Sequence, residues 1–117
     1  MSEKVFNLAD AKDRVDGDKE FYEELAAMFL DTFDDSYGAL KKACENLDSK
    51  ALTELSHSLK GSLANLGAER ASAVSFSLER MGRSGNFEGL NQIIETLFDE
   101  VGKFKLEVED LKSRADW

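Results

Sequence analysis

The chain contains no proline, one cysteine and one histidine among its 117 residues. Proline is the residue that most strongly interrupts a helix, so its absence favours long helices over a loop-rich fold. The single cysteine, Cys44, cannot form a disulfide within the chain, and we expect it in a helical core in a reducing compartment. One histidine and one distant cysteine also cannot supply the three or four protein ligands of a zinc site.

Basic residues are scarce: 15 lysines and arginines stand against 24 acidic residues, giving a formal net charge of −9. Such a surface repels phosphate backbones and anionic lipids, so we expect neither nucleic-acid nor membrane binding. The sequence also lacks an apolar run of membrane-spanning length, and residues 1–10 lack the layout of a signal peptide. We therefore expect a cytoplasmic protein. The start at Met1 favours one that stands alone, and an excised domain would look the same.

The length and the composition, 42% hydrophobic and 33% charged, suit one globular domain over residues 1–117 with a core of about residues 8–112. Apolar spacing predicts a short first helix over residues 6–15, capped by Asn7. A second helix starts after Asp18, which has the side chain of an N-cap.

The apolar phase of the second helix continues to Leu47, although cap-type residues interrupt it. We expect either one long bent helix or two helices with a break near Asp34. The carboxylates of Asp31, Asp34 and Asp35 could form a metal site, but a capped and solvated helix start is the simpler interpretation.

We expect Asp48 or Ser49 to cap the third helix, which ends at Gly67, and the fourth helix spans residues 69–83. We expect Asn86 to cap the last helix. The predicted core stripe of the fourth helix is Ala71, Val74, Leu78 and Met81.

The last helix has the most regular pattern, with apolar residues at alternating spacings of three and four: Phe87, Leu90, Ile94, Leu97, Val101, Phe104, Val108 and Leu111. Such a heptad indicates helix–helix packing near a +20° crossing angle. A dimeric coiled coil would fit, but three other amphipathic helices in the chain make an intramolecular bundle simpler. Short connections predict an all-α, up-down-up-down antiparallel four-helix bundle with a short extra N-terminal helix, and we expect a monomer.

His57 lies in the third helix, whose apolar stripe is Leu52, Leu55, Leu59, Leu63 and Leu66. On a helical projection the stripe lies roughly 160° from His57, so the imidazole should face solvent. Gly61 and Ala64 lie on the same outer face, and Lys60 lies on the flank one turn away. A glycine inside a helix costs about 1 kcal/mol relative to alanine, so Gly61 indicates a packing or functional reason at this position. Its place beside His57 makes a plain surface histidine the less favoured interpretation.

The residues around His57 limit its chemistry. No Ser-His-Asp trio is evident, although Ser58 and Ser62 are close in sequence. No Gly-rich phosphate loop or kinase signature is present, so we expect no ATP binding. What remains is the imidazole as a nucleophile toward a phosphoryl group, with Lys60 stabilising the charge of the transferred group. Gly61 and Ala64 would leave room for a partner that brings the rest of the active site.

The run His57-Ser58-Leu59-Lys60-Gly61-Ser62, followed by Asn65-Leu66-Gly67-Ala68, resembles the signature of histidine-containing phosphotransfer (HPt) domains of two-component signalling. The resemblance extends from about Leu8 to Leu111. It implies that His57 accepts a phosphoryl group from a receiver-domain aspartate and passes it to another receiver, so the chain is a carrier without kinase activity of its own. It further implies that Lys60 lies beside the phosphoryl group and that Gly61 permits close approach.

The resemblance also implies supporting roles for Glu79, as a hydrogen-bond partner of the imidazole, and for Arg83, as a basic group nearby. A surface ion pair between these two residues is an equal alternative. Receiver domains carry the Mg²⁺, so no cofactor and no metal are expected on this chain.

The expected partners are response-regulator receiver domains and a hybrid sensor histidine kinase. Docking should use the face around His57, with apolar contacts from the short first helix and the helix after it. Phe76 could form an edge of that face, although we favour its packing under the N-terminal segment. Two alternatives remain: a non-catalytic helical adaptor, and the phosphorylatable domain of a chemotaxis-type kinase, which would require domains that this chain lacks.

Overall fold

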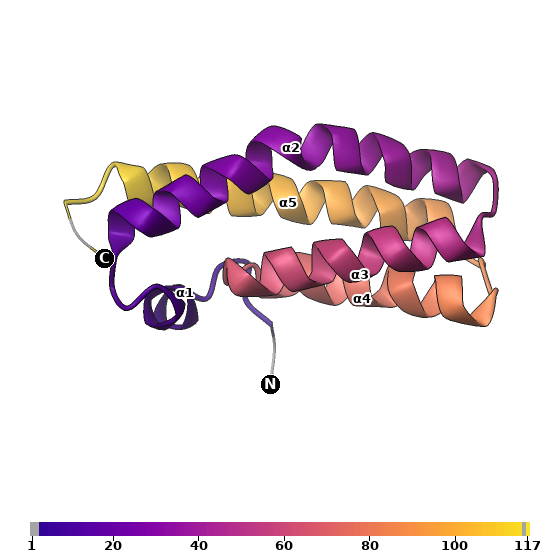
Figure 1. Ribbon diagram of the computed structural model, residues 1–117, viewed down its shortest axis with the longest axis horizontal. Helices are drawn as coiled ribbons and strands as arrows, with labels where there is room; N and C mark the ends of the chain where they lie inside the picture. Colours follow the sequence, from indigo (N-terminus) through magenta and orange to yellow (C-terminus); the bar gives the residue numbers. More distant parts are fainter. Residues whose placement is uncertain (1–2, 116) are drawn as a thin grey trace.

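In the computed structural model, which describes residues 3–115 and 117, five helices account for most of the described residues. They are α1 (Leu8–Arg14), α2 (Lys19–Glu45), α3 (Ser49–Asn65), α4 (Glu69–Ser84) and α5 (Leu90–Lys112). Helices α2 to α5 run side by side with alternating direction, and α1 lies across one end of them (Figure 1). The predicted all-α antiparallel bundle with a short N-terminal helix is confirmed.

Three of the helix starts follow the predicted capping residues. The side chains of Asn7, Asp18 and Asp48 each accept a hydrogen bond from the backbone N–H three residues later. Each bond satisfies one of the donors that the first turn of a helix leaves without a partner. The connections between consecutive helices are short, and the antiparallel order of the bundle follows from them.

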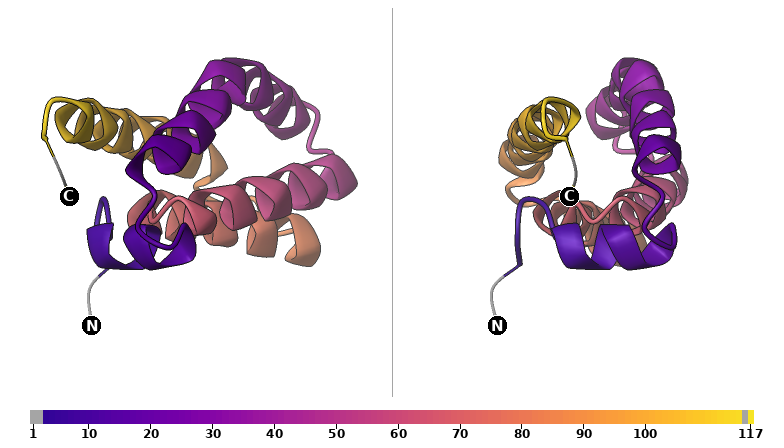
Figure 2. Two further views of the ribbon diagram at one scale, coloured as in Figure 1. Left: turned by 60° about the vertical axis from the view of Figure 1, so that its left-hand side comes forward. Right: turned by 90° about the vertical axis from the view of Figure 1, so that its left-hand side faces the viewer.

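Helix α2 is one continuous helix of 27 residues, so there is no break near Asp34. The helix bends along its length (Figure 2). The Thr32 hydroxyl donates to the carbonyl oxygens of Met28, at 3.3 Å, and Phe29, at 3.2 Å, and such bonds to the preceding turn bend helices. Asp34 and Asp35 are exposed in mid-helix rather than at a helix start, and the described residues hold no acidic or histidine cluster able to bind a metal ion.

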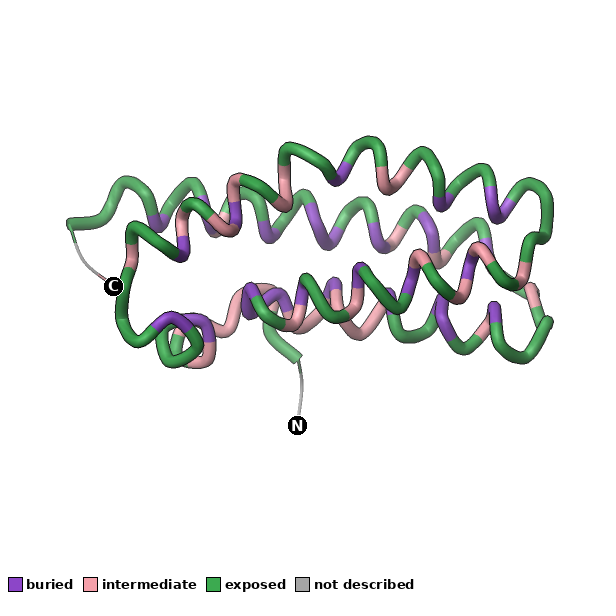
Figure 3. Tube along the Cα trace, viewed as in Figure 1, coloured by how far each residue is buried: buried purple, intermediate pink, exposed green. Residues whose placement is uncertain are grey.

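The bundle core is built around α5, whose inward face is buried along its whole length (Figure 3). The heptad positions from Leu90 to Leu111 are confirmed as core, and Cys44 on α2 is buried with them. The predicted start of this helix is wrong. Asn86 does not cap α5: its side chain accepts from the Glu88 N–H in the preceding turn, and the helix begins after Gly89. Phe87 is half-buried but precedes the helix.

The stripe predicted for α3 is confirmed at Leu52, Leu59, Leu63 and Leu66, which are buried in the core. Small and polar residues of α3 and α4 are buried beside the apolar ones. Ser56 of α3 and Ser75 of α4 are fully buried, whereas Leu55, Val74 and Met81 are only half-buried. The stripe predicted for α4 is therefore correct for Ala71 and Leu78 alone. Each buried serine donates to a carbonyl of its own helix, so neither leaves an unpaired hydroxyl in the contact.

The N-terminal segment fixes the end of α3. The Asn7 N–H donates to the Gly67 carbonyl at 2.7 Å, and the Tyr22 hydroxyl donates to the Leu66 carbonyl at 2.6 Å. Gly67 has a φ of +78°, and a Cβ there would lie 2.8 Å from the Asn7 oxygen. Only glycine combines this left-handed φ with the absence of a Cβ. The close contact with Asn7 therefore holds the C-terminal end of α3.

Candidate functional site

His57 lies in mid-helix on the outer face of α3, with 64% of its side chain exposed. Its Nδ1 lies 3.1 Å from Oε2 of Glu79 on α4. One turn on, Gly61 is exposed and a Cβ built on it meets no atom within 4 Å. Ala64, a further turn along, is half-buried and small. The predicted outward imidazole and the open surface beside it are both present.

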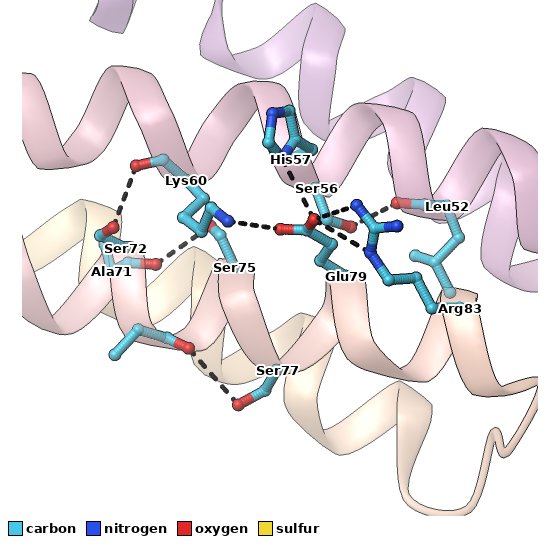
Figure 4. Close-up of polar contacts among 11 residues, drawn as sticks. Leu52, Ser56, His57, Lys60, Ala71, Ser72, Ser75, Ser77, Glu79 and Arg83 are labelled. Atoms are coloured by element: carbon cyan, nitrogen blue, oxygen red, sulfur yellow. Dashed lines mark hydrogen bonds and ion pairs between the residues drawn. The ribbon is translucent and has the colours of Figure 1, made fainter.

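Glu79 joins the site residues into one network (Figure 4). Its Oε1 forms an ion pair with Lys60 Nζ at 2.8 Å, and its Oε2 accepts from Arg83 Nη2 at 2.7 Å as well as contacting His57. The Glu79 side chain is only 3% exposed. The Lys60 ammonium and then the Arg83 guanidinium hold the pKa of the Glu79 carboxyl down at about 2, against the opposing effect of burial.

The ionised carboxylate determines the tautomer of His57. A carboxylate without a proton can only accept, so Nδ1 must carry the proton that the two groups share. The neutral imidazole then keeps its lone pair on Nε2, at the far end of an exposed ring. The arrangement presents a nucleophilic nitrogen to solvent on a ring whose other nitrogen is anchored.

Lys60 lies between two groups of α4. Its side chain is 30% exposed, and its Nζ lies 5.0 Å from the centre of the Phe76 ring. Phe76 is 45% exposed and also lies beneath the Arg80 guanidinium, so it is not buried under the N-terminal segment as we favoured. The ammonium is held beside the imidazole and keeps partial access to solvent.

Of the predicted site residues, the network brings together His57, Lys60, Glu79 and Arg83, and Gly61 lies on the open surface next to it. The i,i+4 ion pair between Glu79 and Arg83 and the contact between Glu79 and His57 are both present and share one carboxylate. The burial of Glu79 was not predicted, since the apolar stripe assigned to α4 turned this residue outward.

Grooves lie on both sides of the exposed face of α3. One groove, about 570 Å³ in volume, runs between α2 and α3 and is lined by Leu25, Met28, Phe29, Leu66, Ser62 and Asn65 among others. The second involves α1, α3 and α4, and Lys60 and Ala64 line it together with Asp10 and Arg14 of α1. Of the two helices expected to offer apolar surface for docking, α2 lines its groove with apolar side chains, whereas α1 lines the other groove with Asp10 and Arg14.

A model of the Hpt domain family matches residues 24–114. The chain belongs to the Hpt domain family. Its fold is similar to that of histidine-containing phosphotransfer protein B (HptB) from Pseudomonas aeruginosa PAO1, with a TM-score of 0.84 and 21% identity over 93% of this chain and 95% of that one. A search of curated protein sequences finds no match.

Membership of the Hpt family makes this chain a phosphotransfer carrier of two-component phosphorelays. Hpt domains carry phosphoryl groups rather than act as kinases, and they interact with receiver domains and kinases. Within the described residues, no helix of this Hpt domain is both long enough and apolar enough to cross a membrane.

Proposed function

We propose that His57 is the phosphoryl acceptor of this Hpt domain and that its Nε2 is the reacting atom. The observation that carries the proposal is the contact between Nδ1 and the buried carboxylate of Glu79, on a ring that is otherwise exposed. It supplies a fixed tautomer and a fixed ring orientation, which are the two conditions that an imidazole nucleophile needs.

In the proposed step, the Nε2 lone pair attacks the phosphorus of an aspartyl phosphate on a receiver domain. The N–P bond forms, the P–O bond to aspartate breaks, and the aspartate leaves as a carboxylate. The ring gains positive charge as the bond forms, and the proton on Nδ1 stays there. The ionised Glu79 stabilises that charge, while the ammonium of Lys60 stabilises the phosphoryl oxygens.

The surface around His57 supports docking of a whole domain. Gly61 and Ala64 leave space on the face of α3 that carries the imidazole, and the groove between α2 and α3 adds an apolar surface further along α3, where Ser62 lines it. The receiver brings Mg²⁺ and the aspartate, so this chain holds no cofactor and has no kinase activity of its own. We further propose that residues 1–117 form one domain and that the protein is a monomer in the cytoplasm. Its upstream partner is a hybrid sensor histidine kinase.

The test uses a receiver domain phosphorylated with labelled phosphate, mixed with the wild-type chain and with His57→Gln. We expect wild type to gain a label that is labile in acid and stable in base, and His57→Gln to gain none. Returning the label to a fresh receiver should require Mg²⁺ and stop with a chelator.

Equal labelling of both proteins would contradict the assignment of His57. If wild type and His57→Ala bound the receiver equally and neither took up label, the non-catalytic adaptor would be favoured instead.

A further inference from the structure

Each of the four long helices contains one interior glycine, and only one of the four lies in a helix–helix contact. A Cβ added at Gly38, Gly61 or Gly102 meets no atom within 4 Å. At Gly82 of α4 it would lie 2.9 Å from the Thr53 nitrogen and 3.1 Å from the Ser49 carbonyl oxygen, both on the backbone of α3, and it would overlap Thr53 Oγ1. Backbone atoms cannot rotate away, so any side chain at this position must push the two helices apart.

The Gly82 contact lies one turn from the site. Thr53 and His57 are four residues apart on α3, and Gly82 and Glu79 are three residues apart on α4. Because the two helices are antiparallel, the pair Thr53–Gly82 is followed along the contact by the pair His57–Glu79. In the same direction follow the ion pair of Lys60 Nζ with Glu79 and the hydrogen bond from Ser72 Oγ to the Lys60 carbonyl, at 2.9 Å.

The separation of α3 and α4 therefore sets the distance from Glu79 to the imidazole. That distance, 3.1 Å, is already near the long limit for a hydrogen bond, so an added displacement of about 1 Å would break it. Arg83 cannot compensate, because it lies on the same helix as Glu79 and would move with it.

We propose that Gly82 is a positioning residue for phosphoryl transfer: by permitting backbone contact between α3 and α4, it holds Glu79 within hydrogen-bond distance of His57 Nδ1. The proposal rests on the proposed function of His57. It assigns a role to a residue that contacts neither the imidazole nor any reacting atom, and it explains why a buried helix position has no side chain.

The test compares Gly82→Ala with Gly102→Ala, which places the same methyl group in an exposed helix interior with no atom within 4 Å. Nitrogen-15 NMR of the imidazole reports the tautomer, and labelled receiver reports the transfer rate. We expect Gly82→Ala to convert the Nδ1–H tautomer into a mixture with the Nε2–H form and to slow transfer about ten- to a hundredfold. Gly102→Ala should match wild type in both measurements.

A second variant tests the cause and covers a failure of Gly82→Ala to fold. Thr53→Ala removes the atom that lies closest to the added Cβ, so Thr53→Ala/Gly82→Ala should recover part of the tautomer and part of the rate. The proposal would be overturned if folded Gly82→Ala kept the wild-type tautomer and transferred within about twofold of the rate of Gly102→Ala. If Gly82→Ala does not fold, the same result with the double variant would overturn it. If the tautomer changed but wild type took up no label, positioning by Gly82 would stand and the proposed function would fail.

Discussion

The two sides of α3 differ in what their small residues do. On the open side, Gly61 leaves space above the helix, so a partner can reach His57. On the side that packs against α4, Ser56 is fully buried and Gly82 brings the backbones into contact, so Glu79 reaches the imidazole from below. Small residues therefore serve opposite purposes at one site: Gly61 keeps a surface open, and Gly82 keeps a helix contact close.

Among substitutions that leave His57 in place, the largest expected effect comes from Lys60→Ala, which removes the cation paired with Glu79. Loss of one group that stabilises a transferred charge costs about 10²- to 10³-fold in rate, and we expect transfer from a phosphorylated receiver to fall by that much. Rapid-quench measurement of label uptake checks it. Lys50→Ala, an exposed lysine on the same helix, is the matched control and should transfer at the wild-type rate.

Glu79→Gln alters the closed side alone, and we expect transfer to slow about ten- to a hundredfold. The neutral amide cannot stabilise the positive charge that the ring gains, and it does not impose the Nδ1–H tautomer. Glu100→Gln is the matched control, because Glu100 is also buried and pairs with Arg70 at 2.7 Å, but on α5. If the two variants slowed transfer equally, a general loss of structure would explain both.

Gly61→Leu alters the open side alone, and we expect about tenfold slower transfer by a chain that folds at least as stably. The position is exposed with no neighbour within 4 Å, and replacing a helical glycine adds up to about 1 kcal/mol. Thermal unfolding and label uptake on the same samples separate the two effects. Gly102→Leu should show the gain in stability without the loss of rate. Normal transfer by Gly61→Leu would show that the open space at Gly61 is not needed for a partner to reach His57.

A further expected effect is on stability at low pH rather than on transfer. The pKa of the Glu79 carboxyl is held at about 2 in the folded protein, below its ordinary value of 4.5. The folded state therefore binds that proton less readily than the unfolded state, so the contribution of Glu79 to stability is present above about pH 4.5 and disappears as the pH falls toward 2. Denaturant unfolding between pH 7 and pH 2 should show a shallower decline for Glu79→Gln than for wild type. Parallel curves would mean that the carboxylate is not held in its ionised form by the fold.

Much of the helix bundle could be predicted from the sequence, because the signals for its helices are local or strongly periodic. The caps at Asn7, Asp18 and Asp48 act within three residues, and the heptad of α5 buries every helical position that it assigns. The outward direction of His57 followed from the opposite stripe of leucines. These are the cases in which one residue type has one strong physical preference.

The contact between α3 and α4 could not be predicted in the same way. Hydrophobic periodicity assigned Val74 and Met81 to the core, whereas the structure buries Ser75, Glu79 and Gly82. Close helix packing selects for small volume rather than for apolar character, and the charge of Glu79 is tolerated because Lys60 and Arg83 neutralise it. The signal available in the sequence was the spacing of two small residues, Ser75 and Gly82, around Glu79, which indicates a close helix contact on that face of α4.

The most direct test of the account is to find which atom carries the phosphoryl group. Phosphorylated protein, labelled with nitrogen-15, is observed by proton, nitrogen and phosphorus NMR. We predict one phosphohistidine, at His57, with phosphorus bonded to Nε2 and the proton retained on Nδ1 beside Glu79. Phosphorus on Nδ1, or on a residue other than His57, would contradict the claim that the closed side anchors one nitrogen so that the open side can present the other.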